Sequence, residues 1–131
     1  MNKGIAIVIS CEHASNDPGA LEMAKKMSKE LDAPLVSGTK SRLIIELNRT
    51  LAHPGLFSTY SADLSEKDKN KLIKNYYQPY VDKLKKLISD NIKSHGHVLH
   101  LSIHSFTPVF NGHVRTADIG ILFDPARKHE K

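Results

Sequence analysis

The chain has 131 residues, of which 40% are hydrophobic and 25% charged, a composition typical of one globular domain with its own core. We expect a single domain over residues 1–131. The longest uninterrupted apolar run, residues 5–9, is far shorter than the roughly 20 residues of a membrane-spanning helix. This length argues against a transmembrane segment, and we expect no membrane partner.

The formal net charge of +5 raises the question of a nucleic-acid partner. The lysines between positions 67 and 93 lie mostly opposite the apolar stripe of a predicted helix, which is typical of a solvated helix face. The arginines lie elsewhere, whereas nucleic-acid binders commonly interleave arginines and exposed aromatic residues with their lysines. We therefore expect no nucleic-acid partner.

The single cysteine, Cys11, permits no internal disulfide, so the cytoplasm is the expected compartment. His13 is close in sequence, as the base of a cysteine nucleophile could be, but residues two apart on a strand-to-loop turn need not meet in space. We interpret Cys11 as a packed thiol at the end of a strand.

The first part of the chain alternates between extended and helical segments. Residues 5–11 form an apolar run typical of a buried strand, and the turn Asn16-Asp-Pro-Gly19 leads into a helix over residues 20–31. Residues 33–36 form a short extended segment. The segment 42–49 fits either a strand or a helix, and its periodicity does not decide between them.

Glu46 lies within the apolar run of that ambiguous segment. A carboxylate flanked by Arg42 and Arg49 can simply pair with one of them. Alternatively, Glu46 is a metal ligand or a catalytic carboxylate. The spacing alone favours neither interpretation.

A long helix dominates the middle of the chain. Ser65-Glu-Lys-Asp68 has the form of a capping box that begins it, and His95-Gly96 ends it in the manner of a C-cap. Pro79 interrupts the helical pattern, which predicts a kink or two abutting helices near Tyr77.

Two further strands are predicted, over residues 98–103 and 116–123, with a loop at residues 105–115 between them. The resulting order is strand, helix, strand, helix, strand, and the strands are nearly continuous apolar runs. This pattern predicts an α/β fold with a mostly parallel sheet and helices on both of its faces.

Two histidines, His13 and His104, come directly after predicted strands, where α/β enzymes place metal ligands and catalytic groups. We interpret His100, within the strand that precedes His104, as a core histidine. Zinc that hydrolyses an amide needs about three N or O ligands and an open position for water. His13, Glu46 and His104 would supply such a set from three separate segments.

Several motifs follow one another along the chain. They are Ile9-Ser-Cys-Glu-His-Ala-Ser15, Ser41-Arg-Leu-Ile-Ile-Glu-Leu-Asn-Arg49, His100-Leu-Ser-Ile-His-Ser-Phe-Thr-Pro108, Asn111-Gly112, Arg115, Ala117-Asp-Ile-Gly120 and Phe123-Asp-Pro125. In this order they resemble the N-formylglutamate amidohydrolase family over almost the whole chain. The resemblance implies a fold like that of the zinc exopeptidases (phosphorylase/hydrolase-like) and hydrolysis of N-formyl-L-glutamate to formate and glutamate, a step of histidine degradation.

The resemblance also implies that His13, Glu46 and His104 bind zinc, although the family usually has the shorter aspartate at the position of Glu46. Asn111 and Arg115 resemble the family's substrate-side residues. A guanidinium fork suits the carboxylates of a glutamyl substrate.

Arg42 or Arg49 would hold the second carboxylate of such a substrate. Two residues are candidates for catalysis itself. Arg115 is one catalytic candidate, in a mechanism where zinc and a nearby cation would stabilise the oxyanion, and Glu12, beside His13, is a candidate for the proton-transfer carboxylate.

Family members are longer, and the resemblance covers their N-terminal portion. A parallel sheet truncated in this way would expose an edge strand, so we expect a homo-oligomer or another partner to cover it. Three functions follow as hypotheses: a zinc amidohydrolase acting on a small-molecule N-acyl amino acid, a catalytically impaired module that binds a metal or an anion, and a zinc amidase of the peptidoglycan type.

Overall fold

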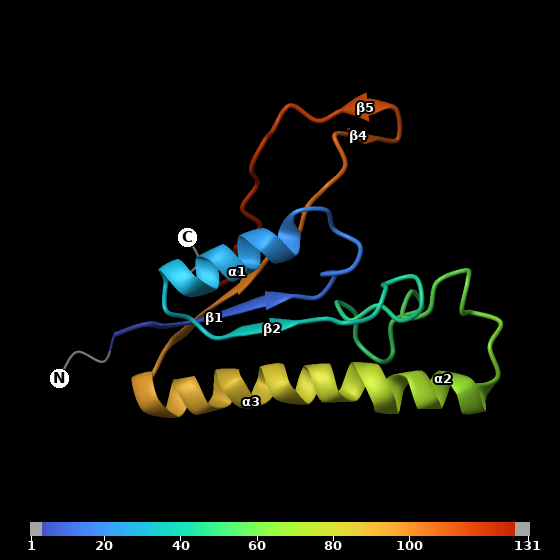
Figure 1. Ribbon diagram of the computed structural model, residues 1–131, viewed down its shortest axis with the longest axis horizontal. Coiled ribbons are helices and arrows are strands. Elements are labelled where there is room, and N and C mark those ends of the chain that lie inside the picture. Colours follow the sequence, from blue (N-terminus) through green and yellow to red (C-terminus); the bar gives the residue numbers. More distant parts are fainter. Residues whose placement is uncertain (1–3, 128–131) are drawn as a thin grey trace.

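A three-stranded parallel sheet lies at the centre of the computed structural model, which describes residues 4–127. The strands stand in the order β2 (Leu35–Ser37), β1 (Ala6–Cys11) and β3 (Val98–Ser102). Helix α1 (Ala20–Glu30) covers one face of the sheet and α3 (Gln78–His95) the other (Figure 1). The predicted α/β fold with a parallel sheet between helices is confirmed.

β1 is the central strand and is buried on both faces. Its side chains alternate, so Ile9 and Cys11 pack with Ala20 and Ala24 of α1, and Ser10 faces the opposite side, toward α3. The parallel register pairs Ser10 with Ser102 of β3. This register places polar side chains of two neighbouring strands on the face that α3 covers.

The predicted long helix consists of three consecutive helical segments. α2 (Glu66–Leu72) begins at Ser65, whose Oγ accepts a hydrogen bond from the Asp68 backbone N–H at 3.2 Å. A π-helical turn, η1 (Ile73–Tyr77), joins α2 to α3. The predicted interruption near Tyr77 lies at this turn, because Pro79 has no backbone N–H for an ordinary helical hydrogen bond.

The ambiguous segment 42–49 is neither a strand nor a helix. It runs through a series of turns, and the Glu46 backbone N–H donates to the Leu56 carbonyl at 2.9 Å. Ile45 and Leu47 are buried in one cluster with Tyr77 and Tyr80. The apolar run therefore belongs to an irregular segment that packs against the helical residues Tyr77 and Tyr80. Such a segment is as hydrophobic as a buried strand, so hydrophobicity alone does not distinguish the two.

Two expectations about the C-terminal part are wrong. The strand predicted over residues 116–123 is absent: these residues are irregular, and Leu122 is 99% exposed. The predicted loop contains a hairpin, β4 (Val109–Phe110) and β5 (His113–Val114), that projects from the body of the molecule (Figure 1). A strand needs a neighbour for its backbone hydrogen bonds, and among the described residues none pairs with 116–123.

Candidate metal centre

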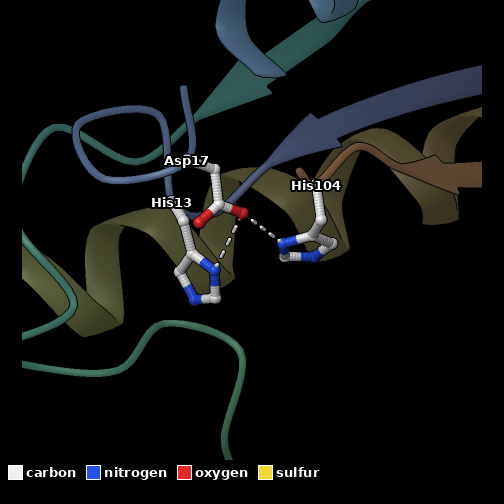
Figure 2. Close-up of side chains that lie close together, drawn as sticks. All are labelled: His13, Asp17 and His104. Atoms are coloured by element: carbon white, nitrogen blue, oxygen red, sulfur yellow. Dashed lines mark hydrogen bonds and ion pairs between the residues drawn. The ribbon is translucent and has the colours of Figure 1, made fainter. Parts of the chain in front are cut away.

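The candidate site lies at the C-terminal end of the parallel sheet, where β1 and β3 both end. His13 follows β1 by two residues, and His104 follows β3 by two residues. The chain turns back after His13, because the His13 carbonyl accepts hydrogen bonds from the backbone N–H groups of Asn16 and Asp17, both at 2.9 Å. This turn brings the Asp17 carboxylate between the two imidazole rings (Figure 2).

Asp17 links the two histidines. Its Oδ2 atom lies 3.0 Å from Nδ1 of His104 and 3.4 Å from Nδ1 of His13. The two rings meet edge to face, with their centroids 4.8 Å apart. Each of the three residues offers one ligand atom within 4.8 Å of the other two, so the group has the composition and spacing of a metal site.

The state of His13 supports a cation at this position. Its Nε2 atom is hydrogen-bonded to the Glu46 carboxylate, and its buried Nδ1 atom has no hydrogen-bond partner within residues 4–127. An ionised carboxylate only accepts, so Nε2 donates to Glu46, while Nδ1 faces an Asp17 oxygen at 3.4 Å. An imidazole nitrogen and a carboxylate oxygen that face each other in a buried space are ligand atoms of the kind that zinc prefers, so these donors fit a divalent ion such as zinc.

Asp17 is not among the ligands predicted from the sequence. It lies within the turn motif Asn16-Asp-Pro-Gly19, whose residue types are those of an ordinary turn. The available signal was the spacing of four residues between His13 and Asp17, which places both side chains on one side of a helical turn.

Glu46 is buried beside His13, on the other side of the ring from Asp17. Its Oε1 atom accepts from His13 Nε2 and from the Asn48 backbone N–H at 3.0 Å, and its Oε2 atom lies 2.9 Å from an Nη atom of Arg42. The pairing with Arg42 considered for this carboxylate is therefore present. The zinc-ligand role of Glu46 stays a prediction.

The surroundings of Glu46 favour its charged form. Burial alone would raise the pKa of Glu46, but the hydrogen bonds from His13 and Asn48 and the charge of Arg42 outweigh it and lower the pKa below its ordinary value. The carboxylate is consequently ionised near neutral pH.

Glu12, 4% exposed, is the centre of a buried hydrogen-bond network on the α3 side of the sheet. Its Oε1 atom accepts from the hydroxyls of Ser10 at 2.5 Å and Tyr80 at 2.8 Å, and its Oε2 atom accepts from Ser102 at 2.7 Å. The same Oε2 atom lies 3.3 Å from Nε2 of His104. Three hydroxyl donors and one imidazole thus surround the carboxylate predicted for proton transfer.

This network also has consequences for pKa values. Burial alone would raise the pKa of Glu12, but the bonds from His104, Ser10 and Ser102 hold it well below its ordinary value. In turn, the contact with Glu12 raises the pKa of His104 against the effect of burial, with a further contribution from Asp17. Burial raises the pKa of the Tyr80 hydroxyl, and the nearby Glu12 charge adds to that effect.

His100 belongs to the same network. Its Nε2 atom lies 2.8 Å from Ser10 Oγ, and because Ser10 donates to Glu12, the ring nitrogen is the donor to Ser10. Burial lowers the pKa of His100. His100 is hydrogen-bonded, as expected, but it is an exposed residue of β3, so the interpretation as a core histidine is wrong.

Cys11 lies at the end of β1 and is completely buried against α1. Burial, followed by the charge of Glu12, raises the pKa of the thiol to about 11. A thiol in this state is not a nucleophile near neutral pH, so the interpretation as a packed thiol is confirmed.

The predicted substrate residues lie in different places. Arg42 is adjacent to the site through its ion pair with Glu46, and its side chain is 44% exposed. Arg49 is exposed, and its carbonyl accepts from the Tyr77 hydroxyl at 2.7 Å. Their roles in substrate binding stay predictions.

Asn111 and Arg115 belong to the hairpin. Asn111 has a φ of 50° and Gly112 a φ of 78°, the paired positive values of a tight two-residue hairpin turn. The Arg115 guanidinium packs 5.1 Å from the ring centroid of Phe106 and 5.0 Å from that of Phe110. The hairpin projects away from the end of β1, so the structure does not bring these two residues to the histidines (Figure 1).

Comparisons with known proteins agree with this fold. A family model described as N-formylglutamate amidohydrolase matches residues 9–130. The crystal structure of gene product Atu2144 from Agrobacterium tumefaciens is similar to this chain, with a TM-score of 0.80 and 27% sequence identity over 94% of the chain. The chain spans 61% of the length of that protein. No curated protein matches the chain significantly.

No helix within residues 4–127 is long and apolar enough to cross a membrane.

Proposed function

The chain belongs to the N-formylglutamate amidohydrolase family, and from that premise we propose that it is a zinc-dependent amidohydrolase. Its substrate is N-formyl-L-glutamate or a similar N-acyl amino acid, and the bond that breaks is the amide between the acyl group and the amino nitrogen. The observation that carries the proposal is the buried Nδ1 atom of His13, which has no hydrogen-bond partner within residues 4–127 and faces Asp17 and His104.

Under this proposal His13, Asp17 and His104 hold the metal. When bound, a zinc ion supplies Lewis-acid chemistry, since it acidifies water and polarises an amide carbonyl. Asp17 contributes the negative charge of the ligand set, and the two imidazoles contribute neutral nitrogen donors. Glu46, predicted from the sequence to be a ligand, instead contacts Nε2 of His13, on the side of the ring away from Asp17, in this arrangement.

Arg42 is the substrate-binding residue that the site supports best. Its guanidinium pairs with Glu46 at 2.9 Å, which ties it to the metal centre, and its partly exposed side chain leaves donors accessible to a solute. A guanidinium forms paired charge-assisted hydrogen bonds with a carboxylate, so Arg42 suits the α-carboxylate or side-chain carboxylate of a glutamyl substrate.

The test combines metal analysis with an assay of formate release. We expect the purified protein to bind one zinc ion per chain and to release formate from N-formyl-L-glutamate. His104→Ala should reduce the rate by about 100-fold or more, corresponding to the several kcal/mol that a catalytic metal contributes. His95→Ala is the matched control, because His95 is exposed at the far end of α3 and should leave the rate unchanged.

A substrate panel narrows the class. N-acetyl-L-glutamate and N-formyl derivatives of neutral amino acids test the acyl and carboxylate requirements, and muropeptides test the peptidoglycan alternative. Absence of both zinc binding and turnover on every substrate would refute the proposal.

A second candidate is a module that binds a metal or an anion without catalysis. It is favoured by the state of Glu12, whose oxygens already accept from Ser10, Tyr80 and Ser102 and which is therefore poorly placed to take a proton from water. The chain also spans only 61% of the similar structure. Thermal stabilisation by zinc or glutamate without formate release would favour this candidate.

A further inference from the structure

The two histidines of the candidate metal centre are held in the same way, although they come from different elements. In each ring Nδ1 faces Oδ2 of Asp17, at 3.4 Å for His13 and 3.0 Å for His104. In each ring Nε2 points to a second, buried carboxylate. That carboxylate is Glu46 for His13 and Glu12 for His104.

The direction of each hydrogen bond follows from the chemistry of the partners. The Glu46 carboxylate only accepts, so Nε2 of His13 is the donor. The link from His104 to Glu12 includes a hydroxyl: Ser102 donates to Glu12 at 2.7 Å, which leaves the Ser102 oxygen to accept from His104 Nε2 at 2.9 Å. Both rings therefore carry a proton on Nε2. Nδ1 of His104 also donates to the Asp17 carboxylate at 3.0 Å in the metal-free protein, so a metal that binds there takes the place of that proton.

Both carboxylates are anchored by groups outside the metal centre. Glu46 is fixed by the Asn48 backbone N–H and by Arg42. Glu12 is fixed by the hydroxyls of Ser10 and Tyr80, which come from β1 and α3. Glu46 and Glu12 are themselves buried, and the Ser10 and Tyr80 anchors of Glu12 are buried as well, so contacts outside the metal centre orient the two carboxylates and, through them, the imidazoles.

We propose that Glu46 and Glu12 are positioning residues, which hold His13 and His104 in the Nε2-protonated form so that both Nδ1 atoms are turned toward one metal beside Asp17. This inference rests on the proposed metal-binding function. It assigns the ligand set to His13, Asp17 and His104, and it replaces the ligand role of Glu46 and the proton-transfer role of Glu12 expected from the sequence. Carboxylates behind metal-binding histidines orient the ring and increase the basicity of the ligand nitrogen.

The first test uses the metal-free wild-type protein and needs no variant. Long-range proton–nitrogen NMR correlations distinguish a protonated imidazole nitrogen from an unprotonated one. We expect Nε2 of both His13 and His104 to be protonated near neutral pH. An unprotonated Nε2 in His13, with the proton on Nδ1, would overturn the inference.

The second test measures metal affinity in Glu46→Gln, by competition for Zn²⁺ with a chromophoric chelator. Loss of a partner behind a metal ligand typically lowers metal affinity by about 10–100-fold, and we expect a loss in that range. Glu66→Gln is the matched control, because Glu66 is exposed on α2 and pairs only with Lys69 among the described residues. An affinity of Glu46→Gln equal to that of the control would contradict the inference.

A third measurement separates a positioning residue from a ligand. The visible spectrum of bound Co²⁺ reports the ligand set, so Glu46→Gln saturated with Co²⁺ should keep the wild-type spectrum, whereas Asp17→Asn should change it. A changed spectrum in Glu46→Gln would make Glu46 a ligand. If Glu46→Gln does not fold, the NMR result on the wild-type protein decides the question.

These outcomes are independent of the amidohydrolase assay. A protein that binds zinc with both Nε2 atoms protonated but releases no formate contradicts only the proposed activity. A protein that releases formate but has the opposite His13 tautomer contradicts only the positioning role.

Discussion

Replacing Tyr80 by phenylalanine removes one hydroxyl from the buried network around Glu12. The Tyr80 hydroxyl donates to Glu12 Oε1 at 2.8 Å, and both side chains are almost completely buried. Phenylalanine keeps the ring and its packing against Leu47 and Ile45. The substitution therefore changes a single hydrogen bond to a buried, ionised group.

The size of the effect follows from the charge of the acceptor. A hydrogen bond to a charged group contributes about 1.5–3 kcal/mol to stability, compared with about 0.5–1.5 kcal/mol for a neutral pair. After the substitution Glu12 Oε1 keeps only the Ser10 hydroxyl, and burial admits little water to replace Tyr80. We expect Tyr80→Phe to lower the free energy of unfolding by about 2 kcal/mol.

Tyr77→Phe is the matched control. The Tyr77 hydroxyl comes from the adjacent helical turn and donates to a neutral acceptor, the Arg49 carbonyl, at 2.7 Å. Urea denaturation of both variants gives the two free energies under one set of conditions. We expect Tyr80→Phe to be the more destabilised by about 1 kcal/mol. Equal losses would refute the argument that an ionised Glu12 depends on Tyr80, and a double-mutant cycle with Glu12→Gln measures the coupling directly.

Three further predictions follow from packing and exposure. A Cβ at Gly38 would lie 2.2 Å from the Glu12 carbonyl oxygen, so Gly38→Ala should lower the free energy of unfolding, measured by urea denaturation, by about 1–3 kcal/mol. Gly120→Ala is the control, because the space around Gly120 is open and its stability should not change. Equal stabilities of the two variants would contradict this prediction. Cys11 is buried, and burial raises the pKa of its thiol to about 11, so the folded protein should resist alkylation at pH 8 and react only when it unfolds. Mass spectrometry measures the labelled fraction, and rapid labelling of the folded protein would contradict this prediction. The exposed apolar side chains of residues 119–123 and the open edge of β3 should promote self-association, and a monomer in sedimentation experiments at micromolar concentration would argue against it.

Local patterns in the sequence determined much of the fold. The apolar run at residues 5–11 predicts β1, Ser65 predicts the start of α2, and Gly96 predicts the end of α3. These features depend on side chains close in sequence, through burial periodicity, capping and permitted backbone angles. The positions of His13 and His104 after strands follow from the same patterns.

The sequence patterns failed where an element depends on its neighbours. Residues 116–123 have the composition of a strand but no pairing partner among residues 4–127, and Asn111-Gly112 is a hairpin turn whose tertiary placement lies away from the histidines. Hydrophobicity measures the tendency to be buried, and it does not specify the partner that completes the burial.

The candidate metal centre shows the same division. Residue type and local context are enough to make His13, Glu46 and His104 candidates, because histidines at strand ends and a carboxylate in an apolar run are chemically conspicuous. The packing of the folded chain places Asp17 against Nδ1 of both rings and Glu46 and Glu12 against their Nε2 atoms. A turn after β1 and the parallel register of β1 and β3 set which atom of each side chain faces which neighbour, and these relations join residues up to 93 positions apart, which no local pattern specifies.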